Sequence, residues 1–137
     1  MNRRALPTLR LLALMLLPAA ARAQTPPDPL AWDAVFKELT AKPGEGQVPF
    51  FFTVTNVSVA EVVITQVLTS CGCTVAKLPE QPWRLAPGAS GKIDASINLA
   101  GKFGVLVKTL TVLTSAGTKL LTIKVNAPLP AQPDSEA

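Results

Sequence analysis

Two cysteines, Cys71 and Cys73, carry the most distinctive chemistry in this sequence, and only Gly72 separates them. A thiol pair at this spacing has three alternative fates. The sulfurs can form a disulfide, both thiolates can bind a soft metal ion such as Cu(I) or Zn(II), or the cysteines can pack as small apolar side chains. The residue types alone leave all three alternatives open.

The disulfide alternative makes a demand on the backbone. In a flat strand, residues i and i+2 lie about 6.5–7 Å apart at Cα, at the edge of what a disulfide spans. We therefore expect Gly72 to act as the hinge that bends the chain, with both sulfurs on the same side and at least partly exposed near an edge or end of the fold. A disulfide that closes so small a ring is expected to be strained and easily reduced.

The metal alternative is restricted by the lack of other ligands. Two sulfurs suit linear coordination of Cu(I), whereas zinc takes four ligands. The sequence has no His, and both methionines, Met1 and Met15, lie in the first segment of the chain. A zinc site at Cys71 and Cys73 would therefore need Asp, Glu or a second molecule. We expect no cofactor, with Cu(I) at the cysteine pair as the alternative.

The same composition argues against an enzyme. Without His, neither Ser-His-Asp nor Cys-His catalysis is available within this chain. A thiol–disulfide exchanger has a thiol whose pKa is lowered by a helix N-terminus or a nearby cation. Lys77 is the nearest basic residue in the sequence after Cys73, and no helix is predicted to follow. We predict that the protein is not an enzyme and has no catalytic residues.

The first residues form a secretory signal. Arginines precede the apolar run Leu11–Leu17, and Ala21-Arg22-Ala23 places small residues at the two positions that a signal peptidase recognises. This pattern predicts a signal peptide over residues 1–23, cleaved between Ala23 and Gln24. The apolar run is far shorter than the roughly 20 residues that a membrane span needs. The predicted mature protein is exported, periplasmic or secreted, and has no membrane span.

Removal of the signal changes the charge. The full chain has 13 Lys and Arg against 9 Asp and Glu, a net charge of +4. The signal contains four arginines and no acidic residue, so the net charge of the mature chain falls to zero. Its lysines are scattered along the sequence, whereas binding of nucleic acid needs a clustered basic face. We predict no nucleic-acid partner.

The elements that must position the cysteines are predicted to be strands. Apolar and polar residues alternate with a period of two, and Gly, Pro and Asn separate the alternating segments. Strands are predicted over residues 32–40, 48–54, 62–68, 92–99, 103–114 and 118–125. The clearest of them directs one row of side chains inward: Ile93, Ala95, Ile97 and Leu99. No segment has the pattern of an amphipathic helix.

These strands predict an all-β fold, an antiparallel immunoglobulin-like sandwich of about seven strands. The sandwich is expected to occupy residues 32–126. Residues 24–31 are rich in proline and predict an extended lead-in. Residues 127–137 are rich in proline, acidic and without apolar periodicity, and predict a disordered tail.

The motifs around the cysteines resemble a known family. The stretch Ser70-Cys71-Gly72-Cys73-Thr74, followed by Leu85-Ala86-Pro87-Gly88, resembles the bacterial domain-of-unknown-function family fifteen-seventy-three, akin to the Hydin-type immunoglobulin-like domains. The resemblance covers about residues 32–126. It implies an exported immunoglobulin-like domain whose Hydin-type relatives act in protein–protein assembly. It implies Cys71, Gly72 and Cys73 as a signature without an established role.

Two hypotheses of function follow. The first is an exported, non-catalytic immunoglobulin-like module that binds another envelope or extracellular protein through its sheet edges or end loops. The alternative is a thiol-redox or Cu(I)-handling protein that uses the Cys71/Cys73 pair.

The mature protein is expected to begin at Gln24, because the signal peptidase should cut after Ala23. The intact mass of the protein purified from the envelope fraction or the culture medium measures this directly. A mass that still includes residues 1–23 in the exported protein would contradict the prediction and would restore the basic net charge.

Overall fold

The computed structural model describes residues 26–129 and places them in nine strands and no helix. The strands are β1 (Leu30–Trp32), β2 (Phe36–Thr40), β3 (Gln47–Asn56), β4 (Val62–Thr69), β5 (Thr74–Lys77), β6 (Trp83–Leu85), β7 (Ser90–Asn98), β8 (Gly104–Thr114) and β9 (Gly117–Ala127). The predicted signal peptide, with its cleavage between Ala23 and Gln24, and residues 130–137 of the predicted tail lie outside the described residues. Residues 26–129 contain no helix that could cross a membrane.

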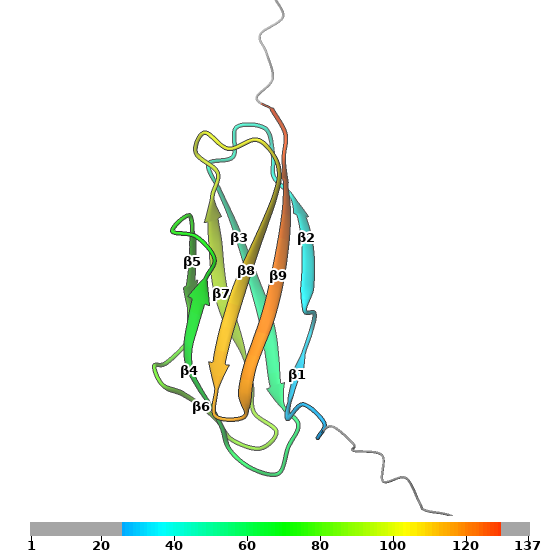
Figure 1. Ribbon diagram of the computed structural model, residues 1–137, viewed down its shortest axis with the longest axis vertical. Coiled ribbons are helices and arrows are strands. Elements are labelled where there is room, and N and C mark those ends of the chain that lie inside the picture. Colours follow the sequence, from blue (N-terminus) through cyan, green and yellow to red (C-terminus); the bar gives the residue numbers. More distant parts are fainter. Residues whose placement is uncertain (1–25, 130–137) are drawn as a thin grey trace, which may run out of the picture.

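The strands form two sheets packed face to face (Figure 1). A four-stranded sheet has the order β1-β3-β7-β5, and a five-stranded sheet has the order β2-β9-β8-β4-β6. The predicted all-β immunoglobulin-like sandwich is confirmed. Most neighbouring strands are antiparallel, as predicted, and the exception is β2, which runs parallel to β9 with Phe36 opposite Thr122.

The predicted number of about seven strands was too low for two reasons. The segment 32–40 is divided between β1 and β2, which belong to different sheets. Asp33 lies between them, and its carboxylate accepts hydrogen bonds from the N–H groups of Ala34 and Thr53, both at 2.9 Å. These bonds satisfy the backbone where the chain leaves one sheet for the other. In addition, β5 and β6 have four and three residues, too few for a pattern of period two to stand out.

The strands also extend just beyond the predicted domain 32–126. β1 begins at Leu30, inside the predicted lead-in 24–31, and β9 ends at Ala127, the first residue of the predicted tail 127–137. Leu30 is buried and pairs with Asn56, which explains why this part of the lead-in is a strand.

The core lies between the two sheets and follows the predicted alternation. In β7, Ile93, Ala95 and Ile97 are buried while Lys92 and Asp94 are exposed, and Leu99 after the strand is also buried. Both sheets contribute side chains that are completely inaccessible to solvent: Phe52, Val54, Ile64, Ile93, Ile97, Leu110, Val112, Leu121, Ile123 and Val125. Burial of each such side chain stabilises the fold by about 1.5–3 kcal/mol, so this double layer is its main source of stability.

One end of the sandwich is organised by a buried polar side chain, Asn56. Its Nδ2 donates hydrogen bonds of 2.8 Å to the carbonyls of Ala60 and Leu85, and its Oδ1 accepts the N–H of Ser58 at 3.0 Å. Asn56 is 0% exposed, so a lost partner here would leave buried polar groups unpaired. The turn at Asn56-Val57-Ser58 is therefore fixed to the end of β6.

The indole of Trp83 in β6 requires a glycine on β7, a strand of the opposite sheet. Trp83 is buried, and a Cβ built on Gly91 would lie 2.3 Å from Cζ2 of its ring. The rigid ring packs directly against the backbone of β7, where no side chain can be accommodated.

The substitution Gly91→Ala is expected to lower the free energy of unfolding by roughly 1–3 kcal/mol, because the new methyl group displaces the indole. Urea denaturation of the mature protein measures this. Gly46→Ala is the matched control, since a Cβ there meets nothing within 4 Å and its φ is not positive. Equal stability of the two variants would contradict the packing of Trp83 against Gly91.

Candidate functional site

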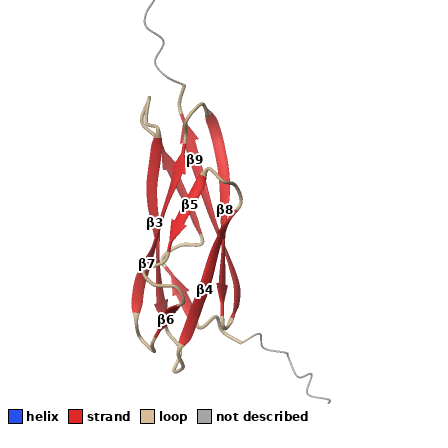
Figure 2. Ribbon diagram, turned by 90° about the vertical axis from the view of Figure 1, so that its left-hand side faces the viewer, coloured by secondary structure: helices blue, strands red, loops and turns tan. Residues whose placement is uncertain are grey.

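The cysteines lie where the chain crosses from one sheet to the other. β4 belongs to the five-stranded sheet and β5 to the four-stranded sheet, and residues 70–73 connect them. Figure 2 looks onto the side of the sandwich where β4 and β5 lie. The site is therefore at an open side of the fold and not between the buried layers.

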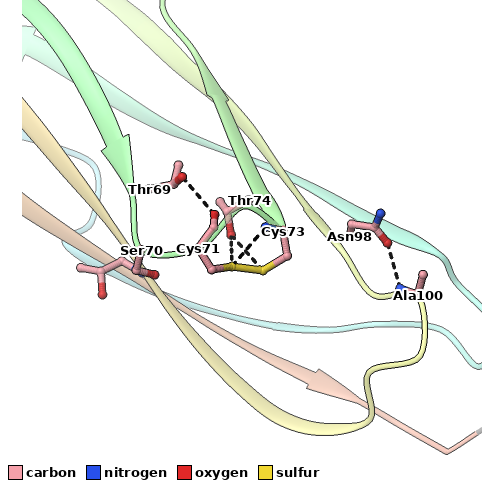
Figure 3. The surroundings of a disulfide bond; sticks show 8 residues. Thr69, Ser70, Cys71, Cys73, Thr74, Asn98 and Ala100 are labelled. Atoms are coloured by element: carbon pink, nitrogen blue, oxygen red, sulfur yellow. Dashed lines mark hydrogen bonds between the residues drawn. A yellow bond between two sulfur atoms is a disulfide. The ribbon is translucent and has the colours of Figure 1, made fainter.

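Of the three alternatives for the pair, the structure contains the disulfide. Cys71 and Cys73 are joined, and their Cα atoms are 5.4 Å apart, closer than residues i and i+2 of a flat strand. The N–H of Thr74 donates to the carbonyl of Cys71 at 3.2 Å, so residues 71–74 form a turn. Both cysteines are half-buried and both sulfurs lie on the same side of the turn, as the disulfide hypothesis expects (Figure 3).

Gly72 is not the required hinge that the spacing suggested. Its side of the turn is exposed, its φ is not positive, and an added Cβ would meet nothing within 4 Å. A turn of ordinary handedness brings Cys71 and Cys73 together without the left-handed conformation that favours glycine. Any L-residue fits this position, and the expectation that the bend needs Gly72 was wrong.

The two sulfurs have different surroundings (Figure 3). The N–H of Cys73 donates to Sγ of Cys71 at 3.3 Å. The hydroxyl of Thr74, a residue only 4% exposed, lies 3.8 Å from each sulfur. Since a hydrogen bond to a charged sulfur stabilises that charge, a thiolate at Cys71 is favoured over one at Cys73.

Hydrogen bonds hold the ends of the turn independently of the sulfur–sulfur bond. The N–H of Ser70 donates to the carbonyl of Thr109 at 3.0 Å, and the N–H of Asn98 donates to the carbonyl of Cys73 at 2.8 Å. The hydroxyl of Thr69 donates to the carbonyl of Cys71 at 3.1 Å. The turn is thus attached to both sheets whether the cysteines are oxidised or reduced.

The disulfide contributes little to the stability of the fold. In the chain-entropy treatment, a cross-link that closes a loop of three residues stabilises a protein by only about 1.5 kcal/mol, against about 3 kcal/mol for 15 residues. Burial of one or two core side chains outweighs it.

The basic residue that the sequence placed nearest the pair is not the one that the fold brings to it. Lys77 is exposed at the far end of β5, opposite Asp94. In the ladder between β4 and β8, Thr69 lies opposite Leu110, and Ser70 bonds to Thr109. The next residue of β8, Lys108, is half-buried and follows the residue that bonds to Ser70, so it belongs to the part of β8 beside the start of the turn.

The metal alternatives lack ligands in the described part of the chain. Residues 26–129 contain no cluster of three or more His, Cys, Asp and Glu side chains that could bind a metal ion. Zinc, which takes four ligands, therefore has no donor set there. Cu(I) needs thiolates, so its binding at Cys71 and Cys73 would require reduction of the disulfide first.

A second candidate site is the outer face of the five-stranded sheet, the sheet that lies in front in Figure 1. The cross-strand register places Leu68, Thr111 and Leu120 side by side on this face. Five of its large apolar side chains are between 44% and 62% exposed, and we call them the outer apolar face: Phe36, Leu68, Val105, Val107 and Leu120. The sequence analysis did not identify these five residues, because the alternating pattern shows only that each strand has one apolar face for the core.

The charges on this face are paired with each other. Lys124 Nζ lies 2.9 Å from the carboxylate of Glu38. Hydrogen bonds from Lys124 and Asn126 lower the pKa of Glu38, so that its carboxyl is ionised at neutral pH and balances the lysine. At the rim, Arg84 pairs with Glu61 at 2.8 Å. The face therefore offers an apolar surface without net charge.

The outer face of the four-stranded sheet is different in kind. Hydrogen-bonded polar pairs cross it, such as Gln47 with Ser96 at 2.7 Å and Thr55 with Ser90 at 2.6 Å. Its exposed aromatic side chain, Phe51, is covered by the ammonium group of Lys92, 4.4 Å from the ring centroid. The five-stranded sheet thus has five large exposed apolar side chains on its outer face, interspersed with polar residues such as Thr109, Thr122 and Lys124. The four-stranded sheet has two, Phe51 and Val75.

A sequence profile of one protein family matches most of the chain. The family is described as a protein of unknown function (DUF1573), and the match covers residues 32–129. No curated protein matches the chain.

Solved structures with the same fold differ widely in sequence. The PapD-like domain 7 of human CEP192 matches with a TM-score of 0.62 and 10% identity, over 92% of this chain and 100% of that domain. The periplasmic chaperone SfaE matches with 0.55 and 14%, over 77% of this chain and 61% of its own. VesB protease of Vibrio cholerae matches with 0.55 and 20%, over 73% of this chain, which spans only 32% of the protease. These structural matches, at 20% sequence identity or less, show a shared immunoglobulin-like fold.

Replacement of both cysteines by alanine is expected to lower the free energy of unfolding by only about 1–2 kcal/mol, because the loop is short and hydrogen bonds hold the turn. Urea denaturation under non-reducing conditions measures this. Ile97→Ala, a completely buried side chain of β7, is the comparison and should cost roughly 2–5 kcal/mol. A loss of 4 kcal/mol or more in the cysteine variant would make the disulfide a main structural element.

Proposed function

Because the chain belongs to DUF1573, a family of unknown function, its own surface must indicate its role, and we propose that it is an exported, non-catalytic module that binds another protein of the cell envelope. Binding occurs through the outer apolar face of the five-stranded sheet. The observation that carries this proposal is the contrast between that face and the polar outer face of the other sheet.

The contrast is informative because folding does not require it. Side chains on the outer face of a sandwich do not contact the core, and in a domain surrounded by water they are expected to be polar. Val105, Val107 and Leu120 are each more than half exposed. Several large apolar side chains exposed on one face are typical of a site of interaction with another protein.

The size of the face fits a specific interface. Strands about 4.8 Å apart, with 11 residues in β8 and in β9, give a five-stranded sheet a footprint of at most about 700 Å². A standard interface buries about 800 Å² on each partner. The sheet with its side chains supplies most of that area.

The open edge of β3 and the short edge strand β6 favour binding through a face. Along the open edge of β3, the carboxylate of Asp33 accepts the N–H of Thr53 at 2.9 Å, and the ammonium group of Lys37 donates to the carbonyl of Phe51 at 2.5 Å. Pro49 of β3, two residues before Phe51, has no N–H that a further strand could bond. These contacts block the addition of a further strand at this edge. The edge strand β6 has only three residues.

The chemistry of the face specifies its partner. Since its charges are already paired, the face does not attract a charged surface, and contact with apolar side chains removes the most water. We therefore assign the occupant as a different protein with an uncharged apolar surface. The periplasmic chaperone SfaE has the same fold, and export to an oxidising compartment agrees with the disulfide, which supports the envelope as the place of binding.

Photo-crosslinking in intact cells tests the proposal. A photoreactive amino acid at Val107 is expected to give one defined adduct with a second protein, identified by mass spectrometry. The same amino acid at Ser96, on the polar outer face, should give none. In the Val107 background, Leu120→Lys should abolish the adduct, because it buries a charge in an apolar interface, whereas Thr55→Lys on the other sheet should not.

Two outcomes would contradict the proposal. Adducts that form equally well from Val107 and Ser96 would show no preference for the apolar face. An adduct of twice the mass of the mature chain would identify a second copy of this protein as the occupant.

A further inference from the structure

We propose that the disulfide between Cys71 and Cys73 is an exchange site that oxidises a pair of thiols in a partner protein. The proposal goes beyond binding through the outer apolar face. It rests on the place of the disulfide, on the hydrogen bonds around it and on the position of Lys108.

The disulfide is placed where it can open without disturbing the fold. Both cysteines are only half-buried in a turn at the open side between β4 and β5. The turn stays attached through the bonds from Ser70 to Thr109 and from Asn98 to Cys73. A disulfide in such a place supplies oxidising equivalents at little cost in stability, unlike one that connects distant strands through the core.

The surroundings of the two sulfurs give the exchange a direction. Sγ of Cys71 accepts the N–H of Cys73 at 3.3 Å, whereas the Thr74 hydroxyl lies 3.8 Å from each sulfur and favours neither. Lys108 follows Thr109, the residue of β8 that bonds to Ser70, and so belongs to the part of β8 beside the start of the turn. A donor and a cation stabilise the thiolate that leaves, so the incoming thiolate attacks Sγ of Cys73, and Cys71 is the leaving group.

The step balances without any further oxidant. A partner thiolate attacks Sγ of Cys73, a new sulfur–sulfur bond forms, and the electron pair of the old bond goes to Sγ of Cys71. The second thiolate of the partner then attacks the partner sulfur of this mixed disulfide and releases Cys73 as a thiolate. Two electrons and two protons pass from the partner dithiol, which becomes a disulfide, to Cys71 and Cys73, which become thiols.

The rate of reduction by dithiothreitol, a neutral dithiol, tests whether the fold activates the disulfide. The oxidised peptide of residues 69–75 is the matched control, because it has the same ring without the sheets. We expect the folded protein to react faster than the peptide, as measured by alkylation and mass spectrometry. Lys108→Met should slow the protein by about fivefold, the effect of one charge near the leaving sulfur, and Lys77→Met should leave the rate unchanged.

The single variants test the direction of attack. The lone Cys71 of Cys73→Ser is expected to show a lower thiol pKa, in the pH dependence of its alkylation, than the lone Cys73 of Cys71→Ser. Circular dichroism spectra identical to that of the unsubstituted protein confirm that both variants fold.

The transfer itself is tested with the unsubstituted protein. In a stoichiometric mixture, a reduced, unfolded peptide with two cysteines should gain a disulfide as the protein loses its own.

Three results would overturn the proposal: a protein no faster than the peptide, equal thiol pKa values in the two variants, or no oxidation of the dithiol peptide. These experiments leave the outer apolar face untouched. Their failure is therefore distinct from a failure of the crosslinking at Val107.

Discussion

The packing of two sheets through inward rows of side chains is the constraint on which the rest of this structure depends. Leu110 and Val112 of one sheet and Phe52 and Ile93 of the other are completely buried, because a strand has a side-chain period of two and every inward position must meet the opposite sheet. The constraint leaves the outward positions free. Their composition therefore depends on something other than folding, and the exposed apolar residues Val105, Val107 and Leu120 of β8 and β9 are the basis of the proposed contact with another protein.

A second consequence concerns the places where the chain leaves one sheet for the other. A backbone that crosses between sheets loses its ladder partners, and its N–H and carbonyl groups need others. Asp33 supplies a carboxylate at the first crossing, and the turn from Ser70 to Thr74 supplies backbone and hydroxyl groups at another. The disulfide therefore adds to a crossing that hydrogen bonds already hold, which separates its chemistry from the stability of the fold.

The sequence predicted what depends on local alternation and missed what depends on register. The strand over residues 92–99 was found because four inward apolar residues alternate with polar ones over its whole length. β5 and β6 are too short for such a pattern, and the parallel pairing of β2 with β9 joins segments far apart in the chain. The position of Lys108 beside the start of the turn follows from the bond between Ser70 and Thr109, which no spacing within the sequence reveals.

The candidate site shows the same division. The two cysteines, separated by Gly72, indicated a disulfide as one of three alternatives. Its predicted place was an edge or end of the fold, because residues i and i+2 of a flat strand are almost too far apart for a disulfide and the chain must bend. The assumption that Gly72 must bend the chain failed, since a turn with ordinary φ values brings the two Cα atoms to 5.4 Å. Neither the backbone conformation nor the available space requires a glycine at Gly72. The glycine leaves the tip of the turn without a side chain. In the proposed exchange, the absence of a Cβ there would keep the approach to the sulfurs open.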